Sequence, residues 1–221
     1  MSVSPRPLRL ALVPAVLTLA VTVLRVVGEL CGWSARWFST APGGGQGVGI
    51  VWLVPVFGAW FGWQLARAGE RPHTGRALLL HGVAVGVYIG GFQAVIRVAA
   101  FDTATPSGLV AQLLSMGAVS VVAAAIAWCA WPRLFATELV YALLARAPVA
   151  ALTFAAVLGD WGTHLEKLGP TDYPGFAPIV RASWLAYAQL VFWTSITACM
   201  GGLCGVLASL FAPRRAAVAA A

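Results

Sequence analysis

The chain has 221 residues, of which 60% are hydrophobic and only 10% are charged, and its formal net charge is +7. A soluble domain carries about 25% charged residues and cannot bury this much apolar surface, so the composition excludes an ordinary globular protein. The positive charge comes from 13 arginines and one lysine that mostly flank apolar runs instead of forming one basic face, and we therefore expect no nucleic-acid partner.

Six long apolar runs follow one another, each about as long as the 20 residues that a helix needs to cross a bilayer. They are continuous and do not alternate with a period of two, and backbone polar groups in lipid have to be satisfied within a helix. We therefore predict an all-α integral membrane protein, a compact bundle of six transmembrane helices in one domain over residues 1–215, with a disordered tail at 216–221. The expected spans are residues 8–30, 46–66, 77–98, 107–131, 135–158 and 184–211.

Proline falls inside three of these expected spans, at Pro14, Pro55 and Pro148. An interior proline removes a backbone donor and kinks a helix. The expected consequence is a tolerated kink at each of the three positions.

The basic residues of the loops are divided unevenly between the two sides of the predicted bundle. One side holds three of them: Arg36, Lys167 and Arg181. The other side holds eight: Arg6, Arg9, Arg67, Arg71, Arg76, Arg133, Arg214 and Arg215. Cytoplasmic loops carry the excess of lysine and arginine, so we expect both termini in the cytoplasm and the protein in the cell membrane.

Small residues recur at every fourth position on three of the predicted helices, as they do where two transmembrane helices pack closely. The glycines concerned are Gly58 and Gly62, then Gly82, Gly86 and Gly90, and finally Gly201 and Gly205. We expect Gly86 and Gly90 to face another helix at close range. Packing inside the bundle is the first explanation, and a face for another chain is the alternative. Besides the lipid bilayer, the expected partners are therefore further copies of this chain or other membrane subunits.

Few charged side chains fall inside the predicted spans, and such side chains usually face protein or water. Arg25 and Glu29 are four residues apart on one helix, as are Gln93 and Arg97, so each pair shares a helix face. The alternative to a functional site is that these pairs only hold the bundle in register. The candidate site is one polar cluster in the outer half of the membrane, centred on Glu29 and made of Arg25, Glu29, Gln93, Arg97, Arg146 and Asp160.

The richest short polar stretch follows the fifth predicted span. Its spacing matches no metal-binding motif, so a solvated loop is the preferred explanation and we predict no metal site. The side chains considered as ligands or acid–base groups are Asp160, His164, Glu166 and Asp172.

The chain also lacks the histidine pair and the short motifs that would indicate a cofactor or catalysis. His81 is the one histidine inside a predicted span, and a haem held by two axial histidines would need a second, so we predict no cofactor. Because neither a Gly-x-Ser-x-Gly nor a Gly-Lys-Ser/Thr motif occurs, we assign no catalytic residue.

Together these observations favour a non-enzymatic protein that serves as a subunit or accessory protein of a membrane complex. The alternative is a small oligomeric transporter or channel with a polar site in the outer half of the membrane, which the buried charges favour. A membrane enzyme that uses the outer loop 159–183 is the third interpretation.

Overall fold

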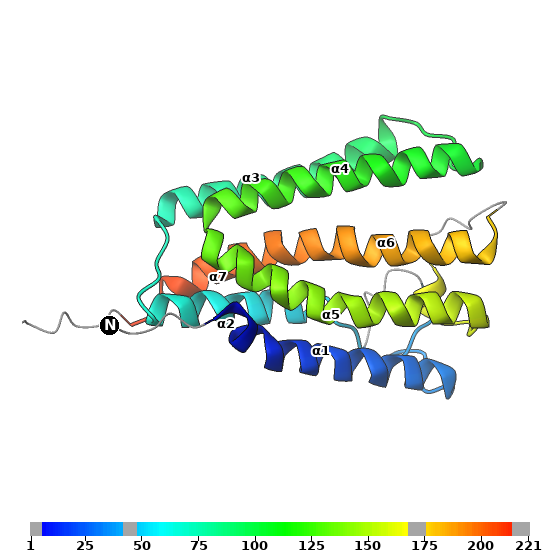
Figure 1. Cartoon of the computed structure of the whole chain (residues 1–221), viewed down its shortest axis with the longest axis horizontal. Coiled ribbons are helices and arrows are strands. Elements are labelled where there is room, and N and C mark those ends of the chain that lie inside the picture. Colours follow the sequence, from blue (N-terminus) through cyan, green and yellow to red (C-terminus); the bar gives the residue numbers. More distant parts are fainter. Residues whose placement is uncertain (1–5, 42–47, 168–175, 214–221) are drawn as a thin grey trace, which may run out of the picture.

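The computed structural model of this chain describes residues 6–41, 48–167 and 176–213. Within these ranges the regular structure is helical, and the long helices lie side by side along one axis (Figure 1). In chain order the elements are α1 (Pro7–Leu30), α2 (Leu53–Arg67), α3 (Thr74–Arg97), α4 (Pro106–Ala130), α5 (Pro132–Gly159), the short 3-10 helix η1 (His164–Glu166), α6 (Pro178–Ile196), the π-helical turn η2 (Thr197–Gly201) and α7 (Gly202–Ser209).

Local sequence explains where the long helices begin and end. Four of them, α1, α4, α5 and α6, have proline in the first turn, where its missing N–H costs nothing and its fixed φ suits the helix. The Thr105 hydroxyl accepts a hydrogen bond from the backbone N–H of Gly108 and caps α4. At its other end, α5 stops at Asp160, whose φ of 48° is left-handed.

Five helical stretches among the described residues are long and apolar enough to cross a membrane. Four are single helices, and the fifth runs through α6, η2 and α7 as one stretch, Pro178–Ser209. Their bounds agree with the expected spans to within three residues at all but one end. The exception is the last stretch, which begins six residues earlier than expected and places Arg181 in the first turn of α6.

The second expected span, 46–66, forms a helix over only part of its length. Residues 46 and 47 lie outside the described residues, and α2 begins at Leu53 and has 15 residues, about 22 Å of helix. A hydrocarbon core is about 30 Å thick. Glycine is a poor helix former, and Gly47 and Gly49 precede α2. Pro55, which we expected inside the helix, instead lies in its first turn.

The bundle has two distinguishable ends. We call the end where α1 begins and α7 finishes the starting end (left in Figure 1), and the opposite end the far end. The short helix α2 occupies only the half next to the starting end, beside α7. In the far half, residues 31–41 after α1 and the short helix η1 lie next to the long helices (Figure 1).

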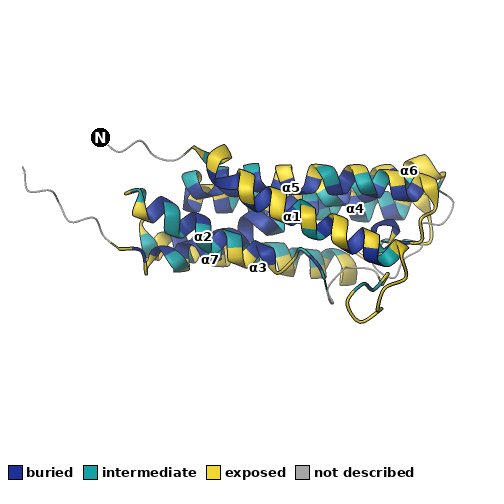
Figure 2. Ribbon diagram, turned by 90° about the horizontal axis from the view of Figure 1, so that it is seen from below, coloured by how far each residue is buried: buried dark blue, intermediate teal, exposed yellow. Residues whose placement is uncertain are grey.

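Two glycine pairs bring α2 and α7 into close contact. A Cβ added at Gly58 would collide with the backbone of Gly201, and a Cβ added at Gly62 would collide with the backbone of Gly205. The buried residues around this contact include Phe61, at 0% exposure. Figure 2 shows the buried residues between the helices and the exposed ones along their outward faces. Because many of the exposed side chains are large and apolar, the described surface is suited to lipid.

Candidate functional site

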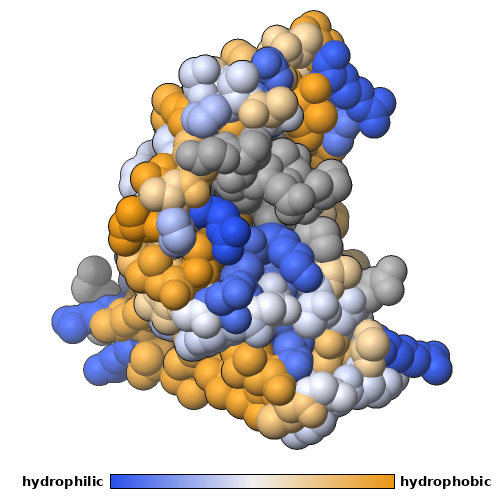
Figure 3. Space-filling view, turned by 90° about the vertical axis from the view of Figure 1, so that its right-hand side faces the viewer, coloured by the Kyte–Doolittle hydropathy of each residue, from blue (hydrophilic) through white to orange (hydrophobic). Residues whose placement is uncertain are grey.

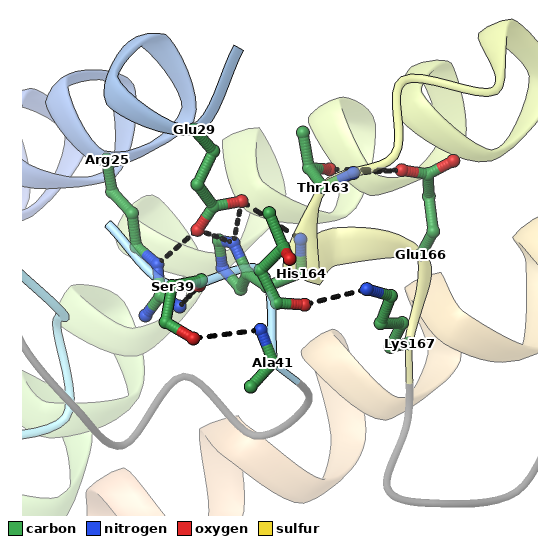
Figure 4. Close-up of polar contacts among 9 residues, drawn as sticks. Arg25, Glu29, Ser39, Ala41, Thr163, His164, Glu166 and Lys167 are labelled. Carbon is green, nitrogen blue, oxygen red and sulfur yellow. Dashed lines mark hydrogen bonds and ion pairs between the residues drawn. The ribbon is translucent and has the colours of Figure 1, made fainter. Parts of the chain in front are cut away.

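Glu29 is the centre of a polar cluster at the far end of α1 (Figure 4). Its side chain is completely buried, and Arg25 Nε donates to its Oε1 over 2.8 Å. The backbone N–H of His164 donates to Oε2 over 2.9 Å, and Nδ1 of the same residue lies 2.7 Å from Oε1. A carboxylate held in this way has the charge-assisted donors that a buried charge requires. The expected ion pair between Arg25 and Glu29 is therefore present.

Further hydrogen bonds tie this pair to the segment that follows α1. Arg25 Nη2 donates to the Ser39 carbonyl over 2.8 Å, and Lys167 Nζ donates to the Thr40 carbonyl over 2.9 Å. The cluster thus joins α1, the segment after it and η1. Seen from the far end, hydrophilic residues gather near the middle of the molecule, between apolar flanks (Figure 3).

The residues considered as metal ligands have other roles or lie apart. Glu166 accepts hydrogen bonds from the backbone N–H and the hydroxyl of Thr163 and so forms the capping box of η1. His164 is bonded to Glu29, Asp160 is exposed at the end of α5, and Asp172 lies outside the described residues. Among the described residues, no three His, Cys, Asp or Glu side chains form a group that could hold a metal ion.

Arg146 lies near the middle of α5, away from the Glu29 cluster. Its guanidinium is 4.9 Å from the centroid of the Trp193 ring, and its Nη1 is 3.4 Å from Oε1 of Gln189. The residue is only 5% exposed. Within the described parts of the chain, Arg146 forms no ion pair, and its charge is met there by an aromatic face and an amide.

The single cluster that we expected is not formed, because Arg146 and three further members lie elsewhere. Gln93 and Arg97 are exposed on α3, and Asp160 is exposed beyond α5. We expected these residues together because they lie at a similar depth in the membrane and share helix faces. Depth does not determine, however, how a helix is rotated about its axis. The face of α3 that carries Gln93 and Arg97 is turned away from α1 and α5.

The same rotation of α3 decides what its glycines contact. A Cβ added at Gly82, Gly86 or Gly90 would meet no other atom within 4 Å. Close packing of Gly86 and Gly90 against another helix of this chain was therefore a wrong expectation. Contact with a second chain stays a prediction.

Two buried polar side chains that our candidate cluster left out lie toward the starting end. Glu138 on α5 and His81 on α3 are both at 0% exposure. In the described structure, both carboxylate oxygens of Glu138 lack a hydrogen-bond partner, and so does Nε2 of His81. Their signal in the sequence was an ionisable side chain inside an apolar run, but nothing in the sequence indicated that they approach the same backbone.

Comparison of the chain with protein-family models, with curated proteins and with solved structures found no match.

Proposed function

We propose that this chain is a multi-pass protein of the cell membrane that serves as a non-enzymatic subunit of a membrane complex. The partner would be a transmembrane helix of a different chain, and α3 would be the helix that binds it. The observation that supports this proposal is the open stripe of Gly82, Gly86 and Gly90.

The surroundings of the stripe support a protein partner. Only 17% of the apolar window of α3 is buried, against 44% for α1 and for α5. Large apolar side chains border the stripe, among them Leu79 at 67% exposure and Ile89 at 52%. Small residues beside large ones form a groove into which another helix can pack closely, and van der Waals contact is a main source of helix association in lipid.

The proposal includes six crossings with both termini in the cytoplasm. Five crossings would be made by the long helical stretches, and the second by α2 together with the residues before it. The starting end would then face the cytoplasm, which agrees with the excess of basic residues in the loops on that side. The cluster around Glu29 would lie at the outer surface.

The size and composition of the complex test the proposal. We would tag the protein, solubilise native membranes gently, and determine particle size and co-purifying chains for the wild type and for Gly90→Leu. Leucine would fill the groove without disturbing the fold, because the position is open within this chain. The wild type should travel with a second membrane protein, and Gly90→Leu should lose it while it melts as the wild type does.

The matched control is Ala118→Leu, a change of a small residue to the same leucine on the exposed face of α4. This variant should keep its partner. If Gly90→Leu also keeps its partner, α3 is not the binding helix. If the wild type contains only copies of this chain, the hetero-complex is wrong.

A homo-oligomer would instead favour the second candidate function, a small transporter or channel. The observation behind this candidate is Arg146, a charge near the middle of a transmembrane helix that has no carboxylate partner among the described residues. Arginine stays protonated in proteins, and charges inside a membrane usually mark the path of an ion or substrate.

A further inference from the structure

His81 on α3 and Glu138 on α5 approach two glycines that follow one another in the chain, Gly202 and Gly201. A Cβ at Gly201 would lie 2.6 Å from Oε1 of Glu138, and a Cβ at Gly202 would collide with Nε2 of His81. The Cα atoms of consecutive residues are about 3.8 Å apart. The two polar ends therefore lie next to the same short stretch of backbone, between α3 and α5.

The backbone at this place departs from a regular α-helix. Gly201 ends the π-helical turn η2, and Gly202 begins α7. Single π-helical turns within α-helices occur frequently at functional sites. His81 and Glu138 are six to seven residues from the beginnings of their helices, about 10 Å from the starting end. Both side chains are therefore at a similar depth within the proposed bilayer.

The hydrogen bond of His81 determines the state of its other nitrogen. Nδ1 lies 3.0 Å from the Ala77 carbonyl, which can only accept, so Nδ1 carries a hydrogen and donates. In the neutral ring, Nε2 is then an acceptor, and the described structure supplies no donor to it. Glu138 has the complementary need, because a protonated carboxyl group is a donor and both of its oxygens are without a partner.

The charges also favour one proton for the two groups. An isolated ion buried away from water is very costly. With one proton between them, the two groups are either both neutral or an imidazolium beside a carboxylate, and the total charge is zero in both states. Such a pair titrates as a unit.

Packing limits what else could occupy this place. Nothing larger than hydrogen is accommodated on either glycine, since even a methyl group would overlap Glu138 or His81. A metal ion would need several ligands, and among the described residues no group of three His, Cys, Asp or Glu is present. A proton needs no room beyond the two side chains, and it fits their chemistry.

We propose that Glu138 and His81 form a buried proton-binding site against Gly201 and Gly202. The proton moves between two positions. Breaking the O–H bond of the Glu138 carboxyl and forming an N–H bond at Nε2 of His81 leaves a carboxylate and an imidazolium, and the reverse step restores both neutral groups. The site is independent of the α3 partner, and its ligand is the proton alone.

Two further titratable groups lie about one helical turn from this place: Tyr141, three residues after Glu138 on α5, and Cys204, three residues after Gly201 on α7. The Tyr141 hydroxyl is hydrogen-bonded to Thr18 on α1 over 2.9 Å, and the thiol of Cys204 is partly buried. His81 differs from both, because its Nε2 is a buried acceptor without a hydrogen-bond partner in the described structure and can take up the proton of Glu138.

Nitrogen NMR of the full chain in lipid nanodiscs tests this site. The protein labelled with ¹⁵N-histidine would be titrated with acid, and the three histidines would be assigned by the loss of one signal set in His81→Gln. The pH at which Nε2 of His81 takes up a proton should differ between the wild type and Glu138→Gln by about one pH unit or more, a tenfold change in proton affinity. Glutamine keeps the size of Glu138 but can neither accept nor release this proton.

The matched control is Glu70→Gln, a carboxyl group beyond α2 near the same end of the bundle. It should leave the titration of His81 unchanged. Midpoints that agree to within about 0.3 unit between the wild type and Glu138→Gln would overturn the proposal.

Infrared spectroscopy keeps the proposal testable if Glu138→Gln does not fold. The carboxyl band of Glu138 should shift in frequency in His81→Gln, because the proposed second position for the proton, Nε2 of His81, is gone. A carboxyl spectrum identical in the wild type and His81→Gln would show that the two groups do not share a proton.

Discussion

The side chain of Glu29 has polar contacts with two separate parts of the chain. Arg25 is one turn away on α1, whereas His164 belongs to η1. The cluster therefore fixes the end of α1 to the beginning of the loop after α5. Its buried carboxylate is compensated by donors, unlike Glu138, which has none in the described structure.

Replacing Glu29 by glutamine should weaken the bundle by about 1–3 kcal/mol, because Arg25 loses its ionic partner in a buried place. Thermal or denaturant unfolding in detergent would measure the loss. In a double-mutant cycle, Arg25→Gln should recover part of it, since the two residues are in contact. The control is Arg97→Gln, an exposed residue on α3 whose effect should simply add to that of Glu29→Gln. If the effects of Arg97→Gln and Glu29→Gln on the free energy of unfolding are not additive, Arg97 is coupled to Glu29, which contradicts its exposed position on α3.

At the scale of the helices, the glycine stripes divide into two kinds. Gly58 and Gly62 on α2 pack against Gly201 and Gly205, backbone against backbone. A Cβ added to the stripe on α3 would meet nothing within 4 Å in the described part of the chain. The same four-residue spacing therefore serves the fold in one place and presents a free groove in another.

A methyl group at Gly62 should be costly because it meets the Gly205 backbone, which cannot rotate away as a side chain can. We expect Gly62→Ala to lower the free energy of unfolding by about 1–3 kcal/mol. The matched control is Gly82→Ala, which adds the same methyl group in open space and removes a helix-breaking glycine. Unfolding of the two variants should differ clearly in detergent, and equal stability would mean that α2 and α7 are further apart than described.

In the whole molecule, α1 begins and α7 finishes at the same end of the bundle (Figure 1). The α2–α3 connection also lies at this end, whereas the α3–α4 connection lies at the far end. These connections allow the orientation to be measured with single cysteines. The native free cysteines Cys31, Cys129, Cys199 and Cys204 would first be replaced by serine or alanine.

In intact cells, a membrane-impermeant maleimide should label a cysteine placed at Ala104, and it should not label one placed at His73. Both positions are exposed, and the orientation that we propose places the loop with His73 in the cytoplasm. Permeabilised cells provide the control, because both cysteines should then react. If only His73→Cys is labelled in intact cells, the protein has the opposite orientation in the membrane.

The sequence by itself determined the helices and much of their length. In lipid, every backbone polar group has to be satisfied within its own segment, so a long apolar run has few alternatives to a helix. Proline occupies the first turn of α1, α4, α5 and α6 and suits these beginnings, although α6 begins six residues earlier than we expected. The pair of Arg25 and Glu29 was equally predictable, because residues four apart on a helix are neighbours in any fold.

Only the tertiary structure decided how each helix is rotated and which distant segments meet. Nearly all faces of these helices are apolar, so hydrophobicity cannot tell a lipid-facing face from a buried one, and contacts with neighbouring helices decide it. That is why Gln93, Arg97 and the α3 glycines face outward against expectation. For the same reason, the contact of His164 with Glu29 and the approach of His81 and Glu138 to Gly201 and Gly202 could not be derived from spacing along the chain.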